Sequence, residues 1–204
     1  MRDVTQSGPV TPSVLRALQV VGSAVVLGAS IRAARHGVPE WDARAFRAIN
    51  GLPDSWQYLT WLPMQAGALA APLTLGTVVA IRGSRPRGLA IAASGLTSWG
   101  AAKRIKAATD RGRPQAEGEE PTLRIGAADS GLGFPSGHAA VAAAIATTAP
   151  PNGRSGTRYA LAALAVTVGW TRIYAGAHYP LDVVGGWALG CLVGNAATAV
   201  AGTS

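Results

Sequence analysis

The chain has 204 residues, enough for one domain of ordinary size and too few for two well-packed domains. Charged residues, 18 basic and 10 acidic, make up only 14% of the sequence. They occur in short clusters between long stretches rich in Ala, Val, Leu and Gly, and this distribution predicts a membrane protein. Cys191 is the single cysteine, so an intrachain disulfide is excluded.

The first 13 residues are polar and include Pro9 and Pro12, which predicts a flexible cytoplasmic tail over 1–13. We expect residues 14–204 to form a single membrane-embedded domain. Six apolar stretches in it resemble helices that cross a bilayer, a crossing that takes about 20 residues. The fourth and fifth are short, and we expect their helices to extend into flanking residues or to be shielded by neighbours. The stretches are 14–32, 58–81, 88–105, 138–150, 158–173 and 181–201.

Residues 38–50, between the first two stretches, are amphipathic at helical spacing. Trp41, Ala45, Phe46 and Ile49 share one side of this predicted helix. A helix of this kind lies flat at the surface of a bilayer. The predicted fold class is therefore all-α: a polytopic membrane helical bundle with six transmembrane helices and a short interfacial helix in the first outer loop.

Prolines and glycines predict how two of the spans are shaped and packed. Pro63 and Pro72 remove backbone donors from the second span, so we expect this span to bend. In the last span Gly186, Gly190 and Gly194 recur at every fourth residue. This spacing lets the backbone of another helix approach closely, so we expect a packing seam there.

The distribution of charge between the loops predicts the orientation in the membrane. Six spans place both termini and the connections near residues 82–87 and 150–158 on one side. These regions carry seven basic residues and one acidic residue, namely Arg2, Arg16, Arg82, Arg85, Arg87, Arg154 and Arg158 against Asp3. The other side holds eleven basic and nine acidic residues, but several of those cations belong to chemical motifs. Because short basic connections stay in the cytoplasm, we expect a multi-pass cell-membrane protein whose active site faces the extracytoplasmic side.

Three motifs carry chemistry, and each lies at the predicted outer end of a span. The first is Lys106 with Arg113-Pro114, which follows the third span. A Lys point charge and a planar Arg fork held by a rigid turn suit the several oxygens of a phosphoryl group. Taken alone, basic residues at a helix end are equally explained as contacts to anionic lipid headgroups.

The second motif is Pro135-Ser136-Gly137-His138, at the start of the fourth span. A Ser-Gly pair at a helix N-terminus offers backbone N–H groups and the positive end of the helix dipole to an anion. His138, in the first turn, can protonate the oxygen of a departing alcohol or phosphate. Taken alone, Ser136 is equally explained as a helix N-cap.

The third motif joins Arg172, at the end of the fifth span, to His178 and Asp182. Asp182 is four residues past His178, so its carboxylate can accept the ring N–H and leave the other ring nitrogen free to attack phosphorus. Pro180 suits the first turn of the sixth helix, as this geometry requires. The alternative is that Asp182 only caps the sixth helix and His178 only anchors a loop.

The combined pattern resembles the type 2 phosphatidic acid phosphatase superfamily. That group comprises membrane lipid phosphate phosphatases, bacterial acid phosphatases and vanadium haloperoxidases. The resemblance covers residues 58–201, and the three motifs are specific as a set. One departure is Thr171, where the family usually has Ser before the Arg of the last motif. Both residues carry a hydroxyl group.

The resemblance implies a role for each matching residue. His178 would be the nucleophile that forms a phosphohistidine, Asp182 would orient it, and His138 would be the acid for the leaving group. No metal or other cofactor is implied. Arg104 and Arg111 lie outside the motifs, and we assign them no catalytic role. The residues that would hold the phosphate oxygens are Lys106, Arg113, Ser136, Gly137 and Arg172.

The predicted function is that of an integral membrane lipid phosphatase acting on a lipid monophosphate or diphosphate, such as polyprenyl diphosphate, phosphatidic acid or phosphatidylglycerophosphate. Two alternatives stay open: a phosphoryl transferase between lipid carriers, and a non-enzymatic polyprenyl-phosphate binding or transport protein. We expect a lipid phosphate substrate and membrane lipids as partners, and no nucleic acid. The sequence leaves the oligomeric state open. The loop 115–133 is longer than most connections, and we expect it to gate the pocket or to favour a particular headgroup.

Overall fold

The computed structural model describes residues 11–128, 130–150 and 155–202, and most of the predicted tail therefore lies outside the described residues. Within these ranges every regular element is a helix, which confirms the predicted all-α class. The elements are α1 (Pro12–Ala34), α2 (Glu40–Asn50), η1 (Asp54–Trp56), α3 (Gln57–Met64), η2 (Gln65–Gly67), α4 (Ala70–Ile81), α5 (Arg85–Thr109), α6 (Gly137–Thr148), α7 (Ser155–Tyr174) and α8 (Pro180–Val200).

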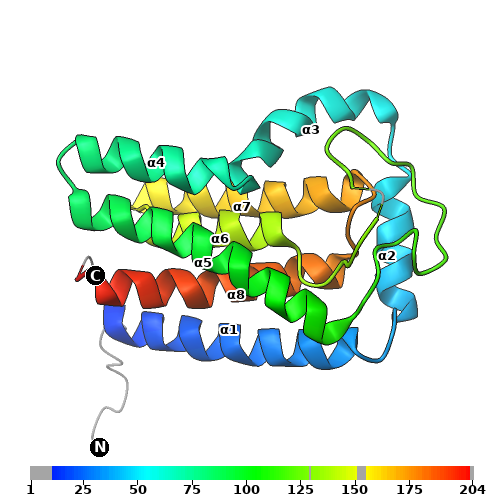
Figure 1. Ribbon diagram of the computed structural model, residues 1–204, viewed down its shortest axis with the longest axis horizontal. Helices are drawn as coiled ribbons and strands as arrows, with labels where there is room; N and C mark the ends of the chain where they lie inside the picture. The colour runs from blue at the N-terminus through cyan, green and yellow to red at the C-terminus, as the bar shows by residue number, and fades with distance from the viewer. Residues whose placement is uncertain (1–10, 129, 151–154, 203–204) are drawn as a thin grey trace, which may run out of the picture.

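The helices form an elongated bundle with one crowded end (Figure 1). Helices α1 and α4 to α8 run along its long axis, whereas α2 crosses one end. The loops that follow α5 and α7 lie at this same end, and α1 begins and α8 ends at the other (Figure 1). The second motif lies after α5, where α6 begins, and the third runs from the end of α7 to the start of α8. Both motifs are therefore at the same end of the bundle.

Helix α6 is the centre of the bundle and packs against α5, α7 and α8. Its residues from Ala139 to Ile145 are all buried. The predicted glycine seam of α8 is confirmed, because these glycines lie so close to α6 that a larger side chain would not fit between the two helices. A Cβ atom at Gly186 would lie 2.5 Å from the backbone oxygen of Ser136, and one at Gly190 would lie 2.2 Å from that of Ala140.

The second predicted span is broken, as its prolines indicate. Helix α3 contains Pro63, and the chain bends by 61° between the segment Asp54–Gly67 and α4. Pro72 lies in the first turn of α4 and packs against Gly95 of α5, where a Cβ atom would be 2.3 Å from the proline ring. The bend therefore separates the segment Asp54–Gly67 from α4, which packs closely against α5.

Two described helices are long and apolar enough to cross a membrane, Ser13–Ala34 and Pro180–Val200, and the bent pair makes up to three. Helix α1 turns large apolar side chains away from the bundle, among them Leu15, Leu18 and Val25. Such an outer face is favourable in contact with lipid tails.

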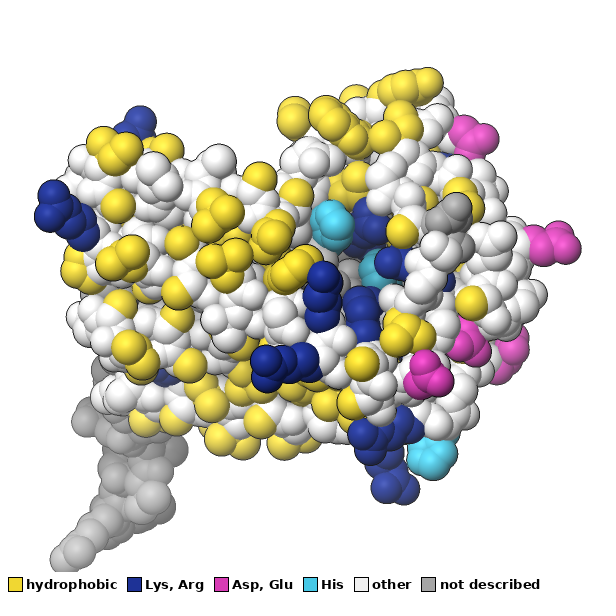
Figure 2. Space-filling view, viewed as in Figure 1, with side chains coloured by type: hydrophobic (Ala, Val, Ile, Leu, Met, Phe, Trp, Pro, Cys, Tyr) yellow, Lys and Arg dark blue, Asp and Glu magenta, His cyan; other side chains and the backbone are white. Residues whose placement is uncertain are grey.

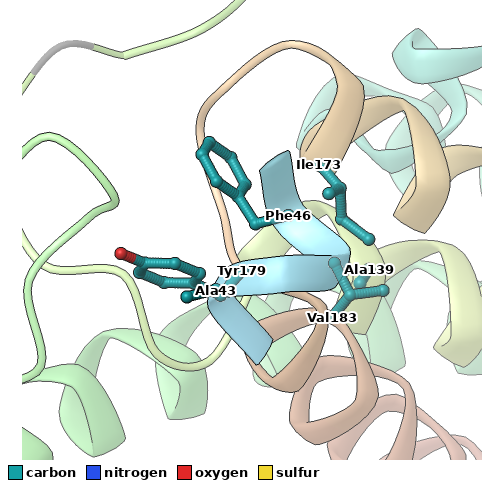
Figure 3. Close-up of a cluster of buried hydrophobic side chains, with 6 residues drawn as sticks. All are labelled: Ala43, Phe46, Ala139, Ile173, Tyr179 and Val183. Carbon is teal, nitrogen blue, oxygen red and sulfur yellow. The ribbon is translucent and has the colours of Figure 1, made fainter. Parts of the chain in front are cut away.

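Helix α2 is present where an amphipathic helix was predicted, and the residues of its predicted apolar side differ in burial. Phe46 is buried in the protein, whereas Trp41 is exposed. The polar residues Asp42 and Asn50 are also buried. The reason is that α2 packs on the start of α8 through Phe46 and Tyr179, whose rings meet edge to face at 5.2 Å (Figure 3). Its polar residues therefore face the loops of the three motifs.

Candidate active site

Hydrogen bonds to backbone carbonyl groups join the three motifs at the crowded end of the bundle. The Ser136 N–H donates to the carbonyl oxygen of Asp182 at 2.8 Å, which links the second motif to the third. Arg113 Nη1 donates to the carbonyl oxygen of Ala177 at 2.9 Å, which links the first to the third. On this face of the molecule two histidine side chains and several Lys and Arg side chains gather around a hollow (Figure 2). The three motifs therefore lie close together at this end of the bundle.

The His178–Asp182 pair has the geometry that its spacing predicts. Nδ1 of His178 lies 3.3 Å from Oδ2 of Asp182, and both side chains are buried. Pro180 is in the first turn of α8, and the same Oδ2 accepts the N–H of Tyr179 at 3.0 Å. Asp182 thus caps α8 and also faces the imidazole of His178. Its role as a helix cap therefore does not exclude its pairing with His178. Nε2 is the ring nitrogen that remains for chemistry.

The surroundings of His178 favour its neutral form. Burial is the largest cause of a His178 pKa well below its ordinary value. Nearby positive groups lower this pKa further, in the order Lys106, Arg172, Arg113 and His138. A neutral imidazole keeps the lone pair on nitrogen that a nucleophile needs.

The three motif cations are held by backbone carbonyl groups around the hollow. Arg172 and Lys106 are anchored by Gly126, Leu132 and Gly133, so these residues of the long loop form part of the wall of the site. The bonds are Lys106 Nζ to the oxygens of Leu132 (2.8 Å) and Gly133 (2.5 Å), Arg113 Nε to that of Ser130 (2.8 Å), and Arg172 Nη1 to that of Gly126 (2.7 Å). The buried Nε of Arg172 has no hydrogen-bond partner among the described residues, and an anion oxygen would satisfy it.

The second motif forms the N-terminus of α6. Ser136 is its N-cap and Gly137 its first residue, so free N–H groups of the first turn point out of the helix end. The Ser136 hydroxyl oxygen accepts the Ala139 N–H at 3.5 Å, a long bond that leaves the hydroxyl proton for another acceptor. His138 packs against η2, where a Cβ atom at Gly67 would lie 2.7 Å from the His138 backbone oxygen.

The PAP2 superfamily model matches residues 86–204, more than half of the chain and all three motifs. The chain belongs to the PAP2 superfamily. No curated protein sequence matches it significantly.

Two solved structures share the PAP2 fold of this chain. One is Aquifex aeolicus LpxE, with 23% sequence identity and a TM-score of 0.70 over 77% of this chain and 94% of that one. The other is a transmembrane PAP2 type phosphatidylglycerolphosphate phosphatase from Bacillus subtilis, with 20% identity and a TM-score of 0.70 over 90% of this chain and 96% of that one. At these identities the likeness concerns the fold alone. Together with the apolar helices, it identifies the chain as a PAP2 membrane protein.

Sequence reasoning missed two residues that contact the motifs of this PAP2 domain. Arg111 was left out because it lies between motif positions, yet it is buried and lies 3.3 Å from Asp182. It follows Asp110, whose φ of +52° turns the chain sharply after α5. Asp42 on α2 binds Arg111. A signal was present for Asp42: a carboxylate beside Trp41 and Ala43, in a helix that buries one side, needs a partner.

Proposed function

We propose that the protein is an integral membrane lipid phosphatase that works through a phosphohistidine. Nε2 of His178 attacks phosphorus, so a P–N bond forms while the P–O bond to the lipid breaks, and His138 gives its proton to the departing oxygen. Water then attacks phosphorus and passes a proton to His138. The P–N bond breaks and inorganic phosphate leaves. Asp182 holds the Nδ1 proton of His178 throughout.

The observation that carries this proposal is the contact of His178 Nδ1 with Asp182 inside a ring of motif cations. In both steps negative charge spreads over the phosphoryl oxygens, so fixed cations stabilise it. Lys106, Arg113 and Arg172 are the groups that we assign to this task. We add Ser136 and Gly137 because the start of α6 offers N–H groups to the same anion.

An apolar cavity beside the site supports a lipid as the substrate. It has a volume of about 240 Å³ and lies between α4, α6 and α7. Ala142 in its wall is one helical turn from His138, and Ala66 in its wall precedes the Gly67 that packs on His138. The lining residues are Ala66, Ala71, Thr74, Leu75, Ala142, Ile145, Leu161, Leu164 and Ala165. A hydrocarbon chain fits such walls, whereas a soluble phosphate ester gains nothing from them.

We propose six membrane crossings, made by α1, the bent α3 and α4 pair, and α5 to α8. With the N-terminus in the cytoplasm, the site then faces the extracytoplasmic side, and α2 lies at that surface. The chain from residue 14 to 204 acts as a single domain. Helix α6 is short for a membrane crossing, but it lies at the centre of the bundle, where α5, α7 and α8 shield it from lipid.

Phosphate release from a panel of purified lipid phosphates tests the function. The panel comprises polyprenyl diphosphate, phosphatidic acid and phosphatidylglycerophosphate, and we expect release from at least one lipid. Phosphate that appears on an added lipid acceptor would identify a transferase. Binding without release would identify a transport or binding protein. We expect a chelator to leave the rate unchanged, and a loss that a divalent ion restores would contradict the metal-independent mechanism.

The variant His178→Ala tests the mechanism. We expect its rate of phosphate release to fall by at least about 10³-fold, because no other group replaces the nucleophile. The matched control is His36→Ala, since His36 is exposed at the end of α1. We expect the control to keep the wild-type rate. Turnover by a folded His178→Ala protein would remove His178 from the reaction.

A further inference from the structure

Arg111 lies between two buried carboxylates at the crowded end of the bundle. Its Nη2 donates to Oδ2 of Asp42 at 2.5 Å, and its Nη1 lies 3.3 Å from Oδ1 of Asp182. The Arg111 side chain is 1% exposed and both carboxylates are 0% exposed. Water therefore does not screen these charges, and each depends on the others for compensation.

The two carboxylates use their oxygens for separate tasks. Oδ1 of Asp42 accepts the N–H of Leu181 at 2.9 Å, while its Oδ2 holds Arg111. Oδ1 of Asp182 faces Arg111, while its Oδ2 faces Nδ1 of His178 at 3.3 Å. A continuous series of contacts thus runs from α2 through Arg111 to the imidazole. The Arg111 guanidinium also lies over the ring of Tyr179, 4.9 Å from its centroid, which limits its movement.

Packing alone does not account for this arrangement. A buried ion pair adds little stability compared with apolar residues of the same volume, so stability is a weak reason to place Arg111 here. Apolar contacts already fix α2 on α8 through Phe46 and Tyr179. What Arg111 adds is a positive charge 3.3 Å from Oδ1 of Asp182, on the side of the carboxylate away from the oxygen that faces His178.

We propose that Asp42 and Arg111 are positioning residues that hold Asp182 in the orientation needed to keep the Nδ1 proton of His178 in place. The proposal rests on the proposed function, because it assigns His178 as the nucleophile. Helix α2, which lies outside the residues matched by the superfamily model, then belongs to the active site. Without Arg111, two buried carboxylates would face each other. Asp182 would take up a proton or turn, and the imidazole would shift toward its Nε2–H tautomer, which cannot attack phosphorus.

The double variant Asp42→Asn, Arg111→Met tests this proposal without changing the net charge of the three buried groups, because it removes one cation and one carboxylate. We expect kcat to fall by about 10²-fold, as for a misplaced reacting group, while KM changes by less than about threefold because neither residue faces the phosphate. Nitrogen-15 spectra of labelled histidine should show the Nδ1–H form of His178 in the wild type and a larger share of the Nε2–H form in the variant. The His36→Gln background simplifies these spectra.

Arg124→Met is the matched control. Arg124 is also buried, and it binds α2 through the Asn50 oxygen and α7 through the Tyr174 oxygen without contacting Asp182. We expect this variant to lose thermal stability and to keep the wild-type tautomer of His178. If the double variant does not fold, Asp42→Asn alone is the second test, since it keeps an oxygen for the Leu181 N–H. It should lower kcat and raise the Nε2–H share in the same direction.

The outcomes separate this proposal from the proposed function. A folded double variant, or Asp42→Asn, with the wild-type kcat and the wild-type tautomer would overturn the positioning role. A wild-type protein that releases no phosphate from any lipid would overturn the proposed function, and the tautomer measurement would still decide the role of Arg111. A tautomer change of equal size in Arg124→Met would show that any loss of stability produces it, and would also overturn the proposal.

Discussion

At the scale of single residues, the site combines groups that would be costly to bury separately. Lys106 and Arg172 are anchored by backbone carbonyl oxygens, and Asp182 faces both a cation and an imidazole. His178, whose pKa is lowered by burial and by the nearby cations, lies among these charges. A measurement of its pKa tests this arrangement directly, because each neighbouring charge changes the pKa of His178.

We expect His178 of the empty protein to stay neutral at pH 5.5, where an ordinary histidine is mostly protonated. A lowered pKa means that the neutral form persists as the pH falls, so protonation of the nucleophile does not limit kcat/KM between pH 7.5 and 5.5. Nitrogen-15 spectra recorded over this range in the His36→Gln background measure the protonation state. Conversion of His178 to the imidazolium form near pH 6.5 would contradict the assigned environment.

At the scale of elements, the seam between α6 and α8 sets the relative position of the second and third motifs. Ser136 begins α6 and Asp182 lies in the first turn of α8, and a backbone hydrogen bond of 2.8 Å joins them. The glycines of α8 permit this approach, since their Cβ atoms would overlap with the α6 backbone. The helix seam is therefore a condition for the site as well as for the fold.

Gly190→Ala tests the seam. A Cβ atom there would lie 2.2 Å from the Ala140 oxygen, so the helices must separate, and we expect a loss of about 1–3 kcal/mol in the free energy of unfolding. Activity should fall as well, because α6 carries the second motif. The control is Gly100→Ala in α5, where no atom lies within 4 Å of the new methyl group. That variant should gain about 0.5–1 kcal/mol from helix propensity. Thermal unfolding in detergent compares the two, and an unchanged Gly190→Ala protein would contradict close packing at this point.

At the scale of the whole molecule, the bundle has two different ends. The crowded end carries α2, the long loop and the motif residues, while α1 begins and α8 ends at the other (Figure 1). The short connection between α4 and α5 belongs to that second end. Arg82 lies in this connection, and Arg85 and Arg87 lie in the first turn of α5. Positive charge at short loops favours the cytoplasm, so we expect this second end of the bundle to face the cytoplasm.

Cysteine labelling tests this orientation. In a Cys191→Ser background, we expect Ala116→Cys in the exposed long loop to react with a membrane-impermeant maleimide on spheroplasts. Ser84→Cys, between α4 and α5, should react only in inside-out vesicles. Labelling of Ser84→Cys on intact spheroplasts, with Ala116→Cys protected, would reverse the assigned orientation.

Much of this architecture follows from local patterns. The helix starts at Ser136 and Pro180, the bend between Pro63 and Pro72, and the glycine seam of α8 each depend on residues close in sequence. The burial of Asp42 in α2 was not predicted from the sequence. Periodicity ranks residues by hydrophobicity alone, whereas burial of Asp42 depends on Arg111, which is 69 residues away.

The sequence by itself determined the helical class, the three motifs and the pairing of His178 with Asp182, because these two residues are only four positions apart at the start of α8. Only the tertiary structure decided which cation meets Asp182 and that α2 reaches the site. Spacing along the chain says nothing about contacts between segments whose separation is set by helix packing. The buried carboxylate of Asp42 and the guanidinium of Arg111 meet because α2 packs across the end of the bundle where α5 ends and α8 begins.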